Sequence, residues 1–328
     1  MTAASATDWS LARAVAHADD PDLDRRLGAA VGVPVLVVDL DRPPRPDEAE
    51  ALERLGRRAA ALPVVTVAVD RAGNGPDPTG DERAPVSFDL VVADPEPVVA
   101  GILAHPHAAV VAAQVLRRPA TTPHDALMVE SFAYATLQAG PEHAAWLARR
   151  GRRVRPPVEE PRVRLADEGG RWRITLDRPR LRNLVDAALR DELVEALRVV
   201  AADPAAREVL LEGAGPVFCA GGDPAEFGSR PDPASAHLVR TQANVAPWLV
   251  ALAGRLRVVV HGAAVGAGIE MAAFAGRVDA HPDTRFRLPE ITMGLVPGAG
   301  GTVSIPARIG RRRTLWWLLT DATVDAAT

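Results

Sequence analysis

The sequence predicts an α/β protein in two parts, and three observations support that prediction. Valine-rich runs such as 33–40 and 64–69 have the length and β-branched content of buried strands, and helical patterns follow them. The length of 328 residues corresponds to about two domains of roughly 150 residues each. Residues 149–161, RRGRRVRPPVEEP, are charged and proline-rich without apolar periodicity, as in a linker. We therefore expect an N-terminal α/β domain over 1–150, a linker over 151–162 and a second domain over 163–328.

The first domain is expected to alternate helices with strands. Residues 11–30 are charged and rich in alanine, which predicts a surface helix broken at Asp20-Pro21. Residues 71–84 are rich in Gly, Asp and Pro, which predicts a mobile loop. The other expected strands are 33–40, 64–69 and 88–93, and the expected helices are 46–61, 97–104 and 128–138. For 108–116 the periodicity leaves a strand and a buried helix both open.

The second domain is expected to open with a hairpin of 163–165 and 172–176, turned at Gly169-Gly170. The pattern over 186–200 predicts a helix with one apolar face. Strands are expected at 209–211 and 258–260, and each leads into a glycine-rich turn. The second turn, 261–268, is followed by a helix that begins near 269.

Two glutamates flank the glycine-rich turns of the second domain. Glu270 lies in the first turn of an expected helix, where the helix dipole and free N–H groups favour a carboxylate that needs no catalytic role. Glu290 lies between Leu288-Pro289 and Ile291, so we expect it to be partly desolvated. Burial raises the pKa of a carboxyl, and two neighbouring carboxyls push their pKa values apart, so one can be an acid while the other is a base.

Composition excludes several classes of function. The formal net charge of −4, with 24% charged residues, argues against a nucleic-acid-binding surface. All 38 basic residues are arginine, so Schiff-base chemistry and a lysine-dependent phosphate loop are excluded. Cys219 is the only cysteine, which excludes internal disulfides and a thiolate metal cluster. No signal-like start and no run of about 18 apolar residues is present, so we expect a cytoplasmic protein that does not enter a membrane.

Four sequence blocks occur in an order that resembles the crotonase superfamily, the enoyl-CoA hydratases and isomerases. The blocks are RITLDRPRLRN (173–183), GPVFCAGGDPAEF (215–227), HGAAVGAGIEMA (261–272) and FRLPEITMGLVPGAGGT (286–302). The resemblance covers about 163–328 and implies a crotonase-like (ClpP/crotonase) spiral of strand-strand-helix units. It also implies that the strand before Gly222 lies beside the strand before Gly262.

The resemblance assigns roles to individual residues. Glu270 and Glu290 match the two glutamates of the hydratase branch, which makes Glu270 the group that handles water and Glu290 the group that handles the α carbon of an acyl-CoA. The backbone N–H groups of Gly222 and Ala267 match the oxyanion hole, where Gly and Ala leave the backbone free to approach a thioester oxygen. Further contacts to coenzyme A or substrate are implied for Arg182, Ala220, Gly221, Asp223, Gly266 and Gly298.

The implied activity is enoyl-CoA hydration or 3-hydroxyacyl-CoA dehydration, with coenzyme A as part of the substrate and neither a tightly bound cofactor nor a metal. Two alternatives stay open at this point. One is an enoyl-CoA isomerase or other crotonase-type chemistry on acyl-CoA, such as that of a decarboxylase, a thioesterase or a cofactor-free dioxygenase. The other is a non-catalytic partner subunit.

Some noticeable residues have a structural explanation. Ala267 stands where the family has glycine, and its methyl group is tolerated only at negative φ. Cys219 has apolar neighbours and no basic partner, His261 has no nucleophile beside it in the motif, and Asp223 is placed to cap a helix that begins at Pro224. The spacings of His105, His107, His124 and His143 match no compact zinc site.

The chain reaches Thr328 where the resembling family continues into helices that cover the acyl pocket and form trimers. Either the N-terminal half or a neighbouring subunit could supply that cover, or the chain is truncated. We expect the apolar residues Leu315, Trp316, Trp317, Leu318 and Leu319 to be exposed and to form a homotrimer or hexamer.

The tetrapeptide LDRP occurs at 40–43 and at 176–179, each time at the end of an expected strand. One interpretation makes the first 150 residues a degenerate crotonase-like half, with Glu130 echoing Glu270. The other is chance recurrence in a chain rich in Arg and Pro, and the sequence leaves both open.

Overall fold

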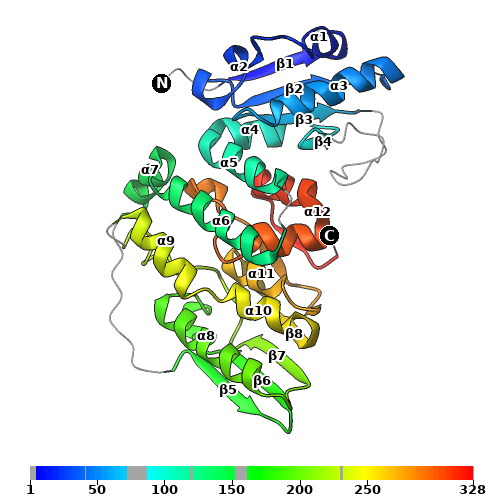
Figure 1. Cartoon of the computed structure of the whole chain (residues 1–328). Helices are drawn as coiled ribbons and strands as arrows, with labels where there is room; N and C mark the ends of the chain where they lie inside the picture. Colours follow the sequence, from blue (N-terminus) through cyan, green and yellow to red (C-terminus); the bar gives the residue numbers. More distant parts are fainter. Residues whose placement is uncertain are drawn as a thin grey trace. The chain divides into compact units, whose positions relative to one another are not determined.

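The structure is a computed structural model that describes residues 5–40, 42–71, 87–118, 121–151, 161–229 and 232–327 (Figure 1). The chain divides into two compact units. Unit 1 comprises Met1–Pro119 and Ile309–Asp321, and unit 2 comprises Ala120–Arg308 and Ala322–Thr328. The predicted mobile loop, from residue 72 on, and residues 152–160 of the predicted linker lie outside the described residues.

Unit 1 is built on a parallel four-stranded sheet in the order β1-β2-β3-β4. Its strands are β1 (Ala6–Ser10), β2 (Val35–Asp39), β3 (Val65–Val69) and β4 (Leu90–Val92). Its helical segments are α1 (Leu11–Ala16), α2 (Leu23–Arg26), η1 (Ala29–Val31), α3 (Pro46–Ala59), α4 (Glu96–Ala104) and α5 (Pro106–Arg117). All five residues of β3 are buried, and a strand covered on both faces needs no polar alternation, which explains its valine-rich sequence.

Most of the elements expected in the first half are present, with one added strand and one undecided stretch now assigned. Strand β1 was not predicted, because ATDWS is short and mixed in polarity, and only its pairing with β2 makes it a strand. The undecided stretch 108–116 lies inside helix α5. Small alanine side chains let this helix bury Ala108, Ala109, Ala112 and Ala113 closely.

The predicted exposure of the apolar cluster at 315–319 is wrong. Leu315, Trp317, Leu318 and Leu319 are at most 7% exposed, and Trp316 is half-buried. They lie in α12 (Gly301–Thr320), which kinks at Gly310 (φ 79°, ψ 157°), so that residues 309–321 belong to unit 1. Helix α4 comes so close that a Cβ on Gly101 would lie 2.0 Å from the Leu319 carbonyl oxygen. The cluster is therefore core, and it no longer supports an oligomer.

Unit 2 contains a five-stranded sheet in the order β10-β8-β7-β6-β5 and a three-stranded sheet in the order β12-β11-β9. The strands are β5 (Val163–Asp167), β6 (Arg171–Leu176), β7 (Glu208–Gly213), β8 (Leu256–Val260), β9 (Ala263–Val265), β10 (Arg277–Ala280), β11 (Arg285–Arg287) and β12 (Val324–Asp325). The β5–β6 hairpin is antiparallel as predicted, and the strands before Gly222 and Gly262, β7 and β8, pair side by side in parallel as predicted.

The helical segments of unit 2 surround these sheets. They are α6 (Pro123–Gln138), α7 (Pro141–Arg150), η2 (Pro179–Leu181), α8 (Ala187–Ala202), α9 (Pro233–Gln242), α10 (Ala246–Leu252), η3 (Ala253–Arg255), α11 (Ala267–Ala272), η4 (Ile291–Met293) and the first part of α12. Helices α6 and α7, which the sequence placed in the first domain, belong to this unit because α6 packs on α9 and α10 and α7 packs on η4. The boundary in this part of the chain thus lies between residues 119 and 120, whereas the sequence predicted it between residues 150 and 163.

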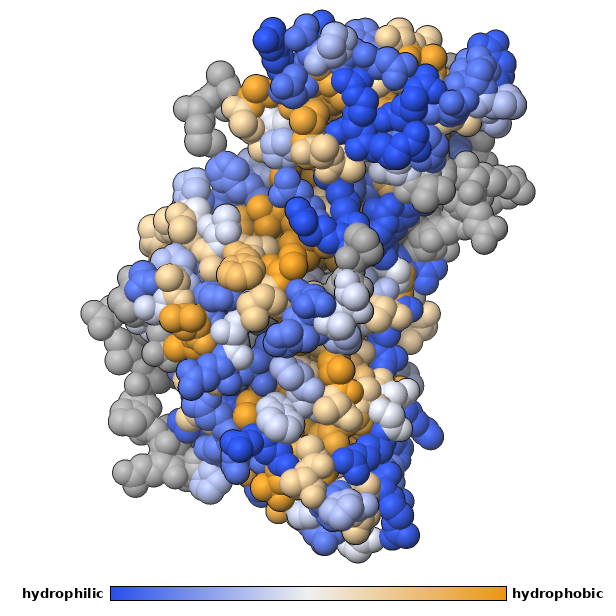
Figure 2. All heavy atoms as spheres, in the orientation of Figure 1, coloured by the Kyte–Doolittle hydropathy of each residue, from blue (hydrophilic) through white to orange (hydrophobic). Residues whose placement is uncertain are grey.

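Among the described residues, no single helix is long and apolar enough to cross a membrane. Helices α4 and α5, which are bent by 112° at the break between them, meet the length and composition of a membrane span only when they are taken together. Figure 2 shows apolar groups in several separate places with hydrophilic side chains between them. The large apolar residues most exposed in the described ranges are Val31, Phe132, Leu165, Val199 and Leu238.

Candidate active site

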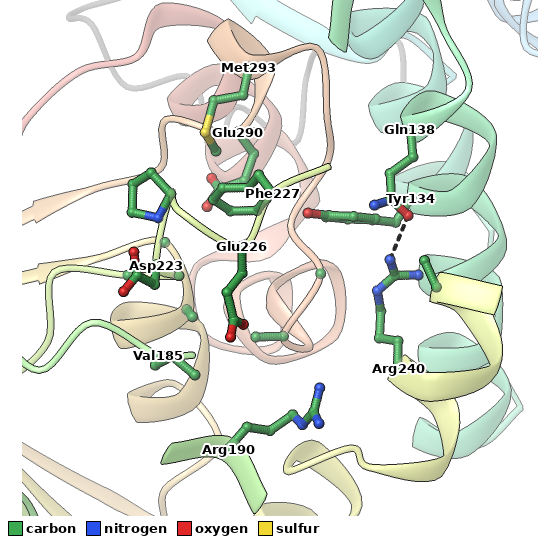
Figure 3. A pocket seen from close by; sticks show the side chains of 18 of the residues that line it. Tyr134, Gln138, Val185, Arg190, Asp223, Glu226, Phe227, Arg240, Glu290 and Met293 are labelled. Atoms are coloured by element: carbon green, nitrogen blue, oxygen red, sulfur yellow. Dashed lines mark hydrogen bonds between the residues drawn. The ribbon is translucent and has the colours of Figure 1, made fainter. Parts of the chain in front are cut away.

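The candidate active site is a pocket of about 570 Å³ within unit 2 (Figure 3). The predicted site residues that line it are Glu270, Glu290, Gly222, Ala267, Ala220, Gly221, Asp223, Gly266 and Gly298. Arg182, the remaining one, does not line the pocket. It adopts a left-handed conformation (φ 53°) after η2, and its carbonyl accepts a hydrogen bond from the Ala220 amide (2.9 Å). Its position supports the turn, and a direct role with substrate stays a prediction.

Two backbone amides in the pocket wall have no acceptor among the described residues. Val185 bonds the Gly221 carbonyl and the Asp223 amide, which leaves the intervening Gly222 N–H unused. Ala267 is the first residue of α11, where an N–H has no partner within the helix. Gly266 takes the positive φ (49°) and Ala267 does not, so the methyl group is tolerated as the sequence required. Both N–H groups therefore belong to pocket-lining residues and have no acceptor among the described residues.

Glu270 is held by the loop that leads into α12. It lies in the first turn of α11, as predicted, and is 2% exposed. Its Oε2 accepts hydrogen bonds from the amides of Ala299 (2.7 Å) and Gly301 (2.9 Å). A Cβ on Gly301 would lie 2.6 Å from the Glu270 Cγ, so only glycine lets the loop come this close.

Glu290 approaches the same turn from the other side. It directly precedes η4 and is 5% exposed. Its Oε1 lies 2.6 Å from where a Cβ on Gly266 would be, one residue before the free amide of Ala267. The two predicted catalytic carboxylates thus share one pocket with both candidate oxyanion donors.

A third buried glutamate, Glu130 of α6, binds the same loop as Glu270. Its Oε1 accepts from the Gly300 amide (2.8 Å), and its Oε2 accepts from the Thr302 amide (2.9 Å) and hydroxyl (2.7 Å). The sequence interpretation that paired Glu130 with Glu270 across a repeat did not anticipate this contact. Glu130 lies in the same unit as Glu270 and next to it in the hydrogen-bond pattern.

The electrostatics of these carboxylates follow from burial and mutual repulsion. Burial raises the pKa of Glu270 well above its ordinary value, and the charges of Glu290 and Glu130 raise it further, against the two amide hydrogen bonds. Burial raises the pKa of Glu130 to about 7, against its three hydrogen bonds. Carboxyls that interact this strongly titrate as a group, and burial and mutual repulsion both favour the form of the group that keeps a proton.

Helices α6 and α9 supply a pocket wall that sequence reasoning missed. The Arg240 guanidinium lies 4.0 Å from the centre of the Tyr134 ring and donates to Gln138 Oε1 (2.8 Å) and Ser131 Oγ (3.1 Å). Figure 3 shows the Tyr134 hydroxyl pointing into the pocket on the side of Glu290. Glu130, Tyr134 and Gln138 recur at every fourth position, and this spacing on one helix face was the available signal.

Three polar residues in or beside the first glycine-rich turn, Asn183, Cys219 and Asp223, are buried and contribute to its structure. Asn183 is fully buried, and its Nδ2 donates to the carbonyls of Ala214, Val217 and Phe218, which shapes the first glycine-rich turn. Cys219 is buried, and burial raises the pKa of its thiol to about 12. The helix that Asp223 was predicted to cap does not form: residues 224–228 are turns, and Asp223 Oδ1 instead accepts from the Ala225 amide within them (3.0 Å). No group of three or more His, Cys, Asp or Glu side chains in the described ranges could hold a metal ion.

Comparison with known proteins agrees with the motifs. Residues 168–327 match the family model "Enoyl-CoA hydratase/isomerase". The 2,3-dehydroadipyl-CoA hydratase of Escherichia coli (strain K12) is 34% identical over 153 residues, 47% of this chain and 59% of the relative. A probable enoyl-CoA hydratase of Mycobacterium leprae (strain TN) is 32% identical over 161 residues, with the same coverages. The solved structure of a putative enoyl-CoA hydratase/isomerase from Mycobacterium abscessus is 33% identical, with a TM-score of 0.47 over 50% of this chain and 65% of that one.

Through residues 168–327 the chain belongs to the crotonase superfamily. Within it, the matching group is the enoyl-CoA hydratase/isomerase family. The chain spans 59% of the length of the curated relatives named above. Helices α6 and α7, which complete the pocket, precede the matched region in the sequence.

Proposed function

We propose that this protein is an acyl-CoA enzyme that adds water to an enoyl-CoA and, in reverse, removes it from a 3-hydroxyacyl-CoA. The observation that carries the proposal is that Glu270 and Glu290 line the same pocket as the unused amides of Gly222 and Ala267. Coenzyme A enters as part of the substrate, and the proposal needs no further cofactor.

The two amides stabilise the charge that the reaction creates. When water adds to the β carbon, electrons move onto the thioester oxygen, and preorganised N–H donors stabilise that oxygen more than they stabilise the neutral carbonyl. Removing one such donor in other enzymes costs about 10²- to 10³-fold in kcat. The glycine and alanine at 222 and 267 leave room for the thioester beside the backbone.

The two glutamates move the protons. In hydration Glu270 takes a proton from water while Glu290 gives one to the α carbon, and each transfer contributes on the order of 10²- to 10⁴-fold. In dehydration Glu290 removes the α proton, the electron pair forms the double bond, and Glu270 protonates the departing hydroxyl. Both directions require a pair that carries one proton, and the raised pKa of Glu270 supports that state at neutral pH.

Helices α6 and α7 supply the cover of the proposed acyl pocket. Tyr134, Gln138, His143 and Leu147 line it from these helices, and His143 Nδ1 is 2.9 Å from the Met293 carbonyl beyond Glu290. A neighbouring subunit is therefore not needed for this wall. The trimer or hexamer remains part of the proposal on family resemblance alone, and light scattering of the full chain measures it.

The second candidate is an enoyl-CoA isomerase, in which one carboxylate moves a proton from one carbon to another. The observation in its favour is that the Glu270 and Glu290 side chains are only 2% and 5% exposed, so little bulk solvent reaches the two carboxylates. Isomerisation needs one base used twice and no water, whereas hydration needs both carboxylates.

Turnover of matched enoyl-CoA, 3-hydroxyacyl-CoA and 3-enoyl-CoA substrates tests the proposal. We expect interconversion of the first two, and its loss in both Glu270→Gln and Glu290→Gln with coenzyme A binding retained. Loss in one variant only, together with 3-enoyl turnover, selects the isomerase. Retained coenzyme A binding without turnover of any substrate would identify a non-catalytic subunit instead.

A further inference from the structure

Four consecutive backbone amides divide between two glutamates. The amides of Ala299 and Gly301 donate to Glu270, and those of Gly300 and Thr302 donate to Glu130. The Thr302 hydroxyl adds a third bond to Glu130. The four donors alternate between the two carboxylates, so the loop at 299–302 is held by Glu270 and Glu130 together.

Glu130 does not contact the reacting groups directly. It is 2% exposed and does not line the pocket, whereas Tyr134 from the next turn of α6 does. Its action on the site must therefore pass through the loop at 299–302 or through its charge.

We propose that Glu130 is a positioning residue, whose carboxylate fixes the loop at 299–302 so that two amides stay on Glu270. Because the two carboxylates share this loop, the charge of Glu130 also acts on Glu270. This inference rests on the proposed hydratase function. It adds to that function a third carboxylate, supplied by a helix outside the family-matched residues.

Several charged and titratable groups surround Glu270 and act on its pKa together with Glu130. Glu290 faces it from the segment before η4, Glu130 from α6, Tyr134 from the next turn of α6, and Cys219 from the first glycine-rich turn. Arg240 of α9 lies on the Glu130 side, where its charge lowers the pKa of Glu130. The charges of Glu290 and Glu130 both raise the pKa of Glu270, so removal of Glu130's charge must lower it.

The pH profile separates this role from simple packing. If the enzyme is active only when Glu270 and Glu290 together carry one proton, kcat/KM plotted against pH is bell-shaped. The rising and the falling limb of that curve then report the two apparent pKa values of the pair. We expect Glu130→Gln to move both limbs to lower pH, by the same amount in hydration and dehydration. We also expect kcat to fall roughly 10- to 100-fold with KM little changed, because a misplaced catalytic group costs that much.

Two further variants divide charge from position. Glu130→Asp keeps the charge but shortens the reach to the loop, so kcat should fall while the limbs stay near their wild-type positions. Thr302→Val removes only the hydroxyl donor, and we expect the same pattern with a smaller loss. The matched control is Glu48→Gln, because Glu48 is also buried and bonded to a backbone amide (Arg45, 2.8 Å) but belongs to unit 1 and does not line the pocket. It should leave the whole profile unchanged.

Several outcomes overturn the inference. Unmoved limbs in Glu130→Gln would remove the charge effect, and a kcat equal to wild type would remove the positioning effect. If the wild-type chain turns over no acyl-CoA, the proposed function fails, but NMR titration of ¹³C-labelled glutamate carboxyls still tests the inference. A lower pKa for Glu270 in Glu130→Gln than in wild type would support it, and an unchanged pKa would refute it.

Discussion

In unit 1 the buried carboxylate Asp89 is paired with an arginine, whereas in unit 2 the buried carboxylates Glu130, Glu270 and Glu290 lie close to one another. Arg117 donates through Nε to Asp89 Oδ1 (2.7 Å), and Thr66 donates through its amide (2.8 Å) and hydroxyl (2.9 Å) to Asp89 Oδ2. The bonds to Glu270 come from backbone amides, and those to Glu130 come from backbone amides and one hydroxyl.

The difference separates burial that holds a fold together from burial that prepares chemistry. A buried charge with an opposite partner is strongly destabilising only when that partner is removed, so the pair serves structure. Neighbouring buried carboxyls cannot all ionise, so they retain a proton that can be transferred. Unit 2 gives up stability to hold this arrangement, and that is expected of an active site rather than of a core.

The largest effect is expected from the catalytic carboxylates. Glu270→Gln and Glu290→Gln should each lower kcat by 10² to 10⁴ or more, because glutamine keeps the volume and an acceptor oxygen but transfers no proton. Unfolding by denaturant should show little loss of stability. Wild-type-like rates in both variants would refute the two-carboxylate mechanism, and would leave Glu270 as a residue that only stabilises a helix start, worth about 0.3 to 1 kcal/mol.

The next effect belongs to unit 1 and changes stability instead of rate. Arg117→Met removes the close cation from the buried Asp89 and leaves only the Arg311 guanidinium, 3.9 Å away, and breaking a buried pair in this way costs up to about 3 to 5 kcal/mol. Hydrogen exchange should show lost protection in β2 and β3. The double change Arg117→Met with Asp89→Leu should recover part of the loss, and a single variant as stable as wild type would contradict the comparison.

Opposite pH dependences of the two units follow from the directions of their pKa shifts. Glu130 has its pKa raised from 4.5 to about 7, so its contribution to stability is present below pH 4.5 and is lost as the pH rises to about 7. Glu48 in unit 1 has its pKa lowered to about 2 by the hydrogen bonds from Arg42 and Arg45, so its contribution is present above pH 4.5 and is lost as the pH falls towards 2.

Hydrogen exchange, corrected for intrinsic rates, measures this in each unit separately. From pH 5 to pH 8 protection should fall in β7 and β8 of unit 2 and stay constant in β2 and β3 of unit 1. Glu130→Gln should reduce the fall in unit 2. An equal fall in both units would show that the carboxylates of unit 2 do not set its pH dependence.

The smallest effect is expected at Cys219. Its thiol is buried and its Sγ lies 3.1 Å from the Asn183 carbonyl, and burial raises the pKa of that thiol to about 12. Iodoacetamide should therefore leave the folded protein unmodified at pH 8, and Cys219→Ala should cost on the order of 1 kcal/mol with little change in rate. Rapid inactivation by the reagent would show that Cys219 belongs to the chemistry.

The sequence by itself determined the elements whose signal is local. Valine-rich strands, the glycine turns at 219–222 and 262–266, and the place of Glu270 in the first turn of α11 all follow from short-range pattern. The pairing of β7 with β8 followed from the order of the motifs and the family resemblance that it carries. The negative φ of Ala267 followed in the same way, because it is a steric property of one residue.

Tertiary structure decided where distant segments meet. The sequence does not indicate that, after the kink at Gly310, residues 315–319 are buried in the core of unit 1. An apolar cluster has the same sequence pattern whether a partner or another part of the same chain covers it. The sequence also does not show that α6 packs in unit 2, where Glu130 accepts hydrogen bonds from the amides of Gly300 and Thr302, 170 and 172 residues along the chain. Every residue except proline has a backbone N–H, so an amide that binds a carboxylate cannot be recognised from the residue types in the sequence.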